Sequence, residues 1–218
     1  KFGLFAAAGA GGGGGAGYFC GGFVTATRVT TVDKFAFSDD SRSTLGTGLS
    51  DDTKSGAAMA NSGTAGYVAI GDDSSTPYVD TVDKFAFDDD SRSTLGTGLS
   101  TGRALAAGMA NSGTAGYICG GQNFTAPSTY AWGQTVDKFA FSDDSRSTLG
   151  TGLSAATSHL AAMANSGTAG YFGGGYVIST LQTTVNKFAF SDDSRSTLGT
   201  GLSAATVSLS AMADGNIA

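Results

Sequence analysis

The stretch TVDKFAFSDDSRSTLGTGLS, residues 31–50, decides the fold, because it returns three more times with little change. Its later copies begin at Thr81, Thr135 and Thr184. The last copy carries Asn186 where the others carry aspartate. A second phrase, AMANSGTAGY, ends at Tyr67, Tyr117 and Tyr171, and a weaker relative ends at Tyr18. A period of about 50 residues predicts a repeat architecture, in which each unit buries its apolar face only against its neighbours.

Each unit carries the signals of four short strands. In the third unit, residues 158–164 are small and apolar and suit a crowded inner strand, and a turn of Asn, Gly and polar residues follows. Residues 170–176 predict a second strand that ends in glycines. In residues 183–190 apolar and polar side chains alternate, which is the period of a half-buried strand. After the polar turn SDDSR, the segment STLGTGL predicts the fourth strand.

These signals predict an all-β protein, a four-bladed β-propeller with four strands per blade. A β-solenoid is the alternative, but its rungs do not need four turn signals per unit. A single propeller domain would span residues 17–218, divided into units 17–65, 66–115, 116–169 and 170–218. Residues 207–213 would then be an inner strand that pairs at Gly17 onward and closes the ring. Residues 1–15 remain as a glycine-rich extension, either a rival inner strand or a connector.

Composition limits the classes of partner. The chain has 12 Lys and Arg against 18 Asp and Glu, a net charge of −6, and this acidity argues against nucleic acid. It contains no apolar run of about 18 residues, so no membrane span is expected. Cys20 and Cys119 occupy matching places in two units. Equivalent positions on different blades should lie too far apart for a disulfide, whose Cα atoms must come within about 7 Å of each other. We therefore expect two free buried thiols.

The strand that ends in paired glycines resembles the kelch repeat. It reads GYFCGG at residues 17–22, GYICGG at 116–121 and GYFGGG at 170–175, and after a variable loop each unit continues with V-x-K-F-x-F. The resemblance covers nearly the whole chain from Gly17. It departs in the second unit, which reads GYVAIG, and in the fourth strand, where kelch blades usually carry a tryptophan. It implies a propeller that binds proteins or carbohydrates through loops at one end of the ring.

The phrase DKFAFSDDSR, together with AGYFGGG, also resembles kelch-like arrays in bacteriophage virion proteins, including tail and head appendages. That resemblance implies a structural or host-attachment role in a virion or outside the cell. Copper oxidases with kelch propellers need a Cys, Tyr and His ligand set. This chain has one His, His159, so that activity and its cofactor do not carry over.

Few residues offer catalytic or metal chemistry. His159 has no partner His or Cys nearby in the sequence, and we expect it to be structural. The paired aspartates of the SDDSR turns resemble Ca²⁺ ligands in type. An arginine follows each pair by two positions, which favours a capped turn with a local charge pair. We therefore expect no enzyme activity, no metal and no cofactor.

Binding is predicted in the variable stretches between the second and third strands, because loops held by a rigid scaffold often carry function. They span residues 23–30, 72–80, 122–134 and 176–183. Aromatic rings beside amides suit sugar rings or a protein partner. The candidate binding residues are Tyr78, Phe124, Tyr130, Trp132 and Gln134. Alternatively, Trp132 packs over its own blade and fills a gap.

Three functional hypotheses follow. The first is a non-enzymatic virion or surface appendage, whose partners are other structural proteins and a host glycan or protein. The second is an intracellular kelch-type adaptor for protein partners, which free thiols would suit. The third, a hydrolase or oxidase, has the least support. The near-identical blades also permit assembly between chains.

Overall fold

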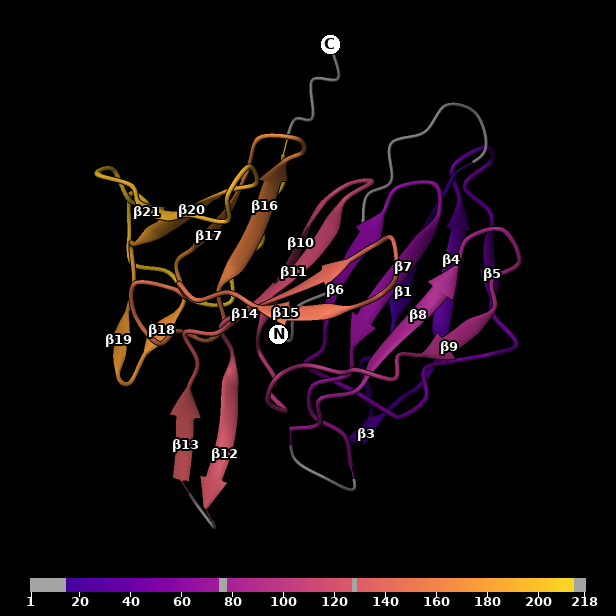
Figure 1. Cartoon of the computed structure of the whole chain (residues 1–218). Coiled ribbons are helices and arrows are strands. Elements are labelled where there is room, and N and C mark those ends of the chain that lie inside the picture. The colour runs from indigo at the N-terminus through magenta and orange to yellow at the C-terminus, as the bar shows by residue number, and fades with distance from the viewer. Residues whose placement is uncertain (1–14, 75–77, 127–128, 214–218) are drawn as a thin grey trace.

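A computed structural model describes residues 15–74, 78–126 and 129–213, and within these ranges the chain forms β-strands and no helix. Four antiparallel sheets, named here I to IV in chain order, make up the body (Figure 1). Sheet I contains β1 (Ala16–Cys20), β4 (Val32–Ala36) and β5 (Arg42–Thr44). Sheet II contains β6 (Ala57–Asn61), β7 (Ala65–Ala69), β8 (Val82–Ala86) and β9 (Arg92–Thr94). Sheet III contains β10 (Ala107–Asn111), β11 (Ala115–Cys119), β14 (Val136–Ala140) and β15 (Arg146–Thr148). Sheet IV contains β16 (Ala161–Asn165), β17 (Ala169–Gly173), β20 (Val185–Ala189) and β21 (Arg195–Thr197).

The prediction of four strands per unit is confirmed for sheets II, III and IV, in which the strands lie in chain order. Sheet I has three strands among the described residues, and residues 1–14, the greater part of the predicted extension, lie outside them. The fourth strand is shorter than predicted. It consists of the residues Arg-Ser-Thr alone, and the Leu-Gly-Thr-Gly-Leu that follows leaves the sheet.

The alternation in the third strand of sheets II and III places one face of that strand against the preceding sheet and the other against the following sheet. In β20, Phe188 faces sheet III and is fully buried, whereas Lys187 faces away from it. The same division holds in β8, where Phe85 packs against sheet I. The core is therefore a series of apolar clusters between successive sheets, and each sheet depends on its neighbours for burial.

The inner strands of sheets II, III and IV lie side by side, β6 next to β10 and β10 next to β16 (Figure 1). Their hairpin turns are linked, since Gly113 N donates to Asn61 Oδ1 at 2.9 Å and Gly167 N donates to Asn111 Oδ1 at 2.7 Å. Glycine permits the close approach: a Cβ at Gly116 would overlap the sulfur of Met59. Successive sheets whose inner strands lie side by side are consistent with a β-propeller-like fold.

The predicted closing strand is not formed. Residues 207–213 make no ladder with β1, whose partner among the described residues is β4, and Met212 is 89% exposed. Ser208 N donates instead to His159 O, so this segment lies beside sheet IV. Sheet I is at the opposite end of the array (Figure 1). The described residues therefore show no closed ring.

Candidate functional site at the hairpin edge

The variable stretches all leave the sheets at the same edge, because each joins the end of a second strand to the start of a third. In sheets I, III and IV the stretch forms a two-stranded hairpin. These hairpins are β2 (Phe23–Val24) with β3 (Thr27–Arg28), β12 (Gln122–Ala126) with β13 (Thr129–Trp132), and β18 (Tyr176–Val177) with β19 (Thr180–Leu181). The last two extend below the sheets in Figure 1, with β3 at the same level. We call this surface, together with residues 72–74 and 78–80 of sheet II, the hairpin edge.

Large apolar side chains are exposed along the hairpin edge. They are Phe23, Val24, Phe124, Tyr130, Ile178 and Leu181. Contiguous exposed apolar surface on a protein is typical of interaction sites. Lys54 and Arg28 add charge, and both pair with Asp72, at 3.5 Å and 3.0 Å.

Three of the predicted binding residues form one aromatic cluster. The rings of Phe124 and Tyr130, on β12 and β13, have centroids 5.4 Å apart. Tyr78, from sheet II, lies 6.2 Å from Phe124 and 6.4 Å from Tyr130. Phe124 is 39% exposed and Tyr130 is 50% exposed. The cluster therefore joins two repeats and presents ring faces and edges to solvent.

The other two predicted residues lie apart from this cluster. Trp132 is half-buried, and its ring centroid is 6.5 Å from that of Tyr176 on the hairpin of sheet IV. This contact crosses to the neighbouring repeat, whereas the alternative prediction placed Trp132 over its own blade. The Gln134 side chain is exposed, and its backbone carbonyl accepts a bond from Leu153 N at 2.8 Å.

Residues other than glycine with positive φ lie on the hairpin edge, in the SDDSR turns and in the connections between sheets. The turn between β2 and β3 holds both Thr25 and Ala26 at positive φ, 44° and 72°, the geometry of a type I′ turn that glycine or asparagine usually occupies. Tyr78 and Ile178 also have positive φ. Such residues are costly and persist where the surrounding structure holds them. At this edge, left-handed backbone is thus found at Thr25, Ala26, Tyr78 and Ile178.

The SDDSR turns have a structural role that the sequence showed only in part. The first aspartate caps its own turn, as in Asp39, whose carboxylate accepts a bond from Ser41 N at 3.0 Å. The arginine does not pair with the turn; Arg42 reaches Asp33 on β4 at 3.1 Å. The second aspartate takes positive φ and contacts the preceding sheet, as in Asp90 with Tyr18. This last contact was missed, because a sequence does not show which repeats touch.

The remaining candidates make local contacts. The Nδ1 of His159 lies 2.9 Å from Ser158 Oγ, and burial lowers the pKa of the imidazole. Both cysteines are free, as predicted, but only Cys119 is fully buried, whereas Cys20 is half-buried. Desolvation still raises the pKa of the Cys20 thiol to about 12. Among the described residues no three side chains of His, Cys, Asp or Glu are grouped to hold a metal ion. No helix in those residues is long and apolar enough to cross a bilayer.

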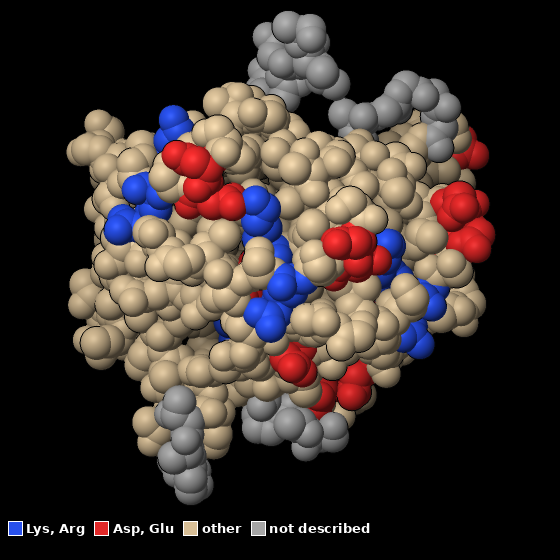
Figure 2. All heavy atoms as spheres, viewed as in Figure 1, with Lys and Arg blue, Asp and Glu red and all other residues tan. Residues whose placement is uncertain are grey.

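Charge is dispersed on the face shown in Figure 2, where Lys and Arg lie beside Asp in small groups. The pairing follows the repeats, since Lys34, Lys84 and Lys138 each contact an aspartate of the next sheet. Charge on this face is therefore mostly paired between neighbouring sheets.

Comparison with known proteins supports the fold. No family model matches the chain, and no curated relative matches it. Among solved structures, one titled "Structure of YjhT" superposes with a TM-score of 0.67 at 17% sequence identity. The match covers 87% of this chain and 64% of that chain. The chain thus spans less than two thirds of that protein's length, and the likeness concerns the fold alone.

Proposed function

We propose that this chain is a non-enzymatic, kelch-like β-propeller scaffold that binds a surface glycan or protein through its hairpin edge. The observation that carries the proposal is the cluster of Tyr78, Phe124 and Tyr130, which stands on an otherwise repeated framework. Aromatic rings offer large apolar area at low conformational cost, and their faces suit the C–H face of a sugar ring or a protein anchor.

We assign the protein to a virion or cell-surface appendage. Support comes from the resemblance of the repeated phrase to phage virion arrays, from the acidic charge, and from the contrast between uniform sheets and variable hairpins. The partners in this assignment are other structural proteins of the particle and a host surface molecule.

A binding experiment tests the proposal. The full chain is applied to an array of bacterial envelope glycans and to whole cells, beside a Phe124→Ser, Tyr130→Ser double variant. We expect the wild type to bind and the variant to lose about tenfold or more in affinity, because centrally placed aromatic anchors dominate binding energy. A matched control, Leu198→Ser, removes an exposed apolar side chain in the segment that follows β21, away from the hairpins. Absence of wild-type binding, or equal loss in the control, would contradict the proposal.

An intracellular adaptor is the second candidate, and the free thiols of Cys20 and Cys119 favour it, since a reducing compartment keeps thiols unpaired. Co-purification of the chain with a cytosolic complex, lost in the same double variant, would favour this adaptor role over the surface role. A screen for glycan turnover completes the comparison, because measurable hydrolysis would exclude both non-enzymatic proposals.

A further inference from the structure

Successive sheets are held together by one joint that recurs three times. A tyrosine of one sheet donates its hydroxyl to the second aspartate of the SDDSR turn in the next sheet. The oxygen–oxygen distances are 2.7 Å for Tyr18–Asp90, 2.6 Å for Tyr67–Asp144 and 2.9 Å for Tyr117–Asp193. A lysine paired with that tyrosine across the sheet binds the same carboxylate. The nitrogen–oxygen distances are 2.7 Å for Lys34–Asp90, 2.7 Å for Lys84–Asp144 and 2.6 Å for Lys138–Asp193.

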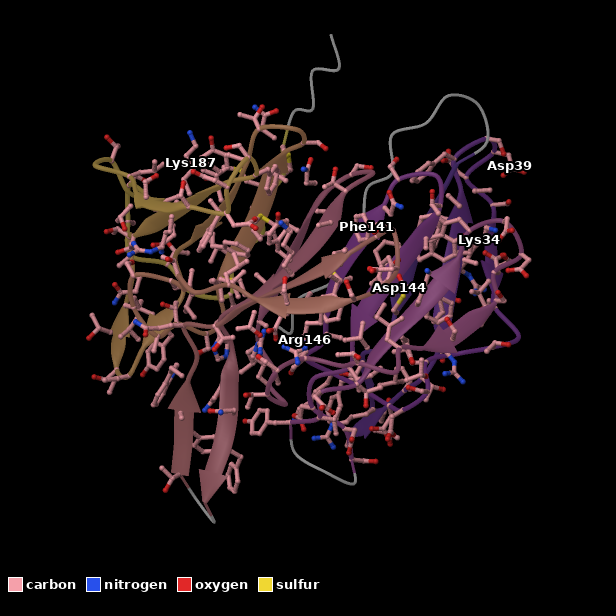
Figure 3. The ribbon with its side chains drawn as sticks, viewed as in Figure 1. Lys34, Asp39, Phe141, Asp144, Arg146 and Lys187 are labelled. Atoms are coloured by element: carbon pink, nitrogen blue, oxygen red, sulfur yellow. The ribbon has the colours of Figure 1, made fainter. Side chains whose placement is uncertain are left out.

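Each joint also contains a stacked aromatic pair. The tyrosine ring lies against a phenylalanine of the next sheet, with centroids 5.1 Å apart for Tyr18–Phe87, 5.2 Å for Tyr67–Phe141 and 5.4 Å for Tyr117–Phe190. A joint therefore has two halves. The Tyr–Lys half is presented by one sheet, and the Phe–Asp half by the sheet that follows. Figure 3 labels Phe141 and Asp144, which lie close together as one Phe–Asp half.

The two end sheets of the array carry one unmatched half each. Sheet IV presents Tyr171 and Lys187, with the Lys187 nitrogen 6.0 Å from the tyrosine ring centroid. Among the described residues this lysine meets no carboxylate. Sheet I presents Phe37, which is 52% exposed, and Asp40, which holds the same positive φ as the aspartates of the joints. In Figure 3, Lys187 and Asp39, the neighbour of Asp40, lie on opposite sides of the molecule.

A second contact between successive sheets, a methionine packed on a glycine of the next sheet, is also left unmatched at the end of the array. Met59 packs on Gly116 and Met109 on Gly170, so both sulfurs are buried between sheets. The equivalent Met163 on sheet IV is 39% exposed.

No described residue covers the matching surface of sheet I. A Cβ at Gly17 would meet the ring of Phe37 at 3.2 Å and no methionine. On this same outer face of sheet I, the Asp33 side chain is 33% exposed, whereas that of Asp83 on sheet II is fully buried. A hollow of about 430 Å³, lined by Phe19, Asp33 and Phe35 among others, lies on the same outer face.

We propose that these two faces bind each other between copies of the chain, so that sheet IV of one copy forms a fourth joint with sheet I of the next. The occupant is a second copy because both halves of the joint are present in this chain, and because a cationic half meets an anionic one. Two different surfaces make the contact, so the interface is heterologous and each copy keeps one free end for another. The rotation at the joint then decides between a ring and a filament.

Charge exchange tests the proposal. Asp40→Lys places a lysine opposite Lys187 in the joint, and Lys187→Asp places an aspartate opposite Asp40, so each variant should associate with itself more weakly than the wild type does. Each variant retains one face that complements the other variant. An equimolar mixture of the two, and the double variant with both changes, should therefore associate again. Sedimentation velocity on the full chain, at concentrations from about 1 µM to about 1 mM, covers the range in which moderate to weak association becomes visible.

We expect the wild type to show a mass that rises with concentration. Each single variant should associate at least about tenfold more weakly, because like charges face each other. Asp88→Lys makes the same change of charge at an exposed residue outside the joints and should leave association unchanged. Lys187→Gln gives a milder loss if the reversal disturbs folding. A wild type that stays monomeric throughout, as it would if one chain closed its own ring, overturns the proposal. Single variants that associate normally, or a mixture that does not recover, also overturn it.

Discussion

The buried ion pair between Arg103 and Asp137 gives the sharpest prediction about stability. Arg103 Nη2 lies 2.8 Å from Asp137 Oδ2, with side-chain exposures of 3% and 0%. At that distance two unit charges attract by roughly 6 kcal/mol at an effective dielectric constant of about 20, before the cost of desolvation. Replacing only the carboxylate leaves a buried cation, and such a loss typically costs about 3 kcal/mol or more.

The other sheets contain the comparisons. Sheet II keeps the aspartate, Asp83, but has Thr53 where sheet III has Arg103, and sheet IV has Asn186 with Thr157. Arg103→Thr therefore reproduces the arrangement of sheet II, and the double change with Asp137→Asn reproduces that of sheet IV. Only Asp137→Asn alone has no counterpart in the chain.

We predict that Asp137→Asn lowers the free energy of unfolding by about 3 kcal/mol, which corresponds to a fall in Tm of about 6–12 °C for a chain of this size. Arg103→Thr should cost about 1 kcal/mol, since Asp137 keeps its bonds from Ser100 and Thr148. The double variant should be more stable than Asp137→Asn alone. Urea unfolding followed by circular dichroism measures all three.

Asp83→Asn is the matched control, because Arg92, its cationic partner, lies 3.5 Å away and is 25% exposed. If Asp83→Asn and Asp137→Asn cost the same, or if the double variant is no better than Asp137→Asn, the buried cation does not set the cost and the reasoning fails.

Three further predictions concern the joints. Tyr67→Phe removes a part-buried hydrogen bond to Asp144 and should lower the free energy of unfolding in urea by about 1–2 kcal/mol, while Tyr171→Phe should cost almost nothing in dilute monomer; equal costs would contradict this. Burial, together with the bonded aspartate, raises the pKa of each joint tyrosine. Above pH 10 these tyrosines therefore lose their protons in the unfolded chain before they do so in the folded one, and the free energy of unfolding should fall as the pH rises. Urea midpoints measured at alkaline pH would show this fall, and midpoints that stay constant to pH 11 would refute it. Gly116→Ala places a Cβ on the facing methionine sulfur and should cost about 1–3 kcal/mol in thermal unfolding, whereas Gly46→Ala, in open space, should be neutral.

The sequence determined the repeating parts of this protein. Its period of about 50 residues predicted one sheet per unit, and the alternation in VDKFA predicted which side chains share a face. The SDDSR phrase predicted a capped polar turn, and the structure shows that Asp39 and its equivalents provide the cap. These features depend on residues close in the chain, so their signals survive in a single repeat.

The tertiary structure decided what lies against what. Only the tertiary structure showed that the ring of Tyr78 packs with those of Phe124 and Tyr130, and that Asp90 accepts a hydrogen bond from Tyr18, 72 residues earlier in the chain. It also showed residues 207–213 beside sheet IV, where the sequence predicted a strand against β1. A repeat contains the same joint halves in every copy, so its sequence fits a closed ring and an open array equally well. The rotation between packed sheets, which arises from side chains of different repeats, separates the two.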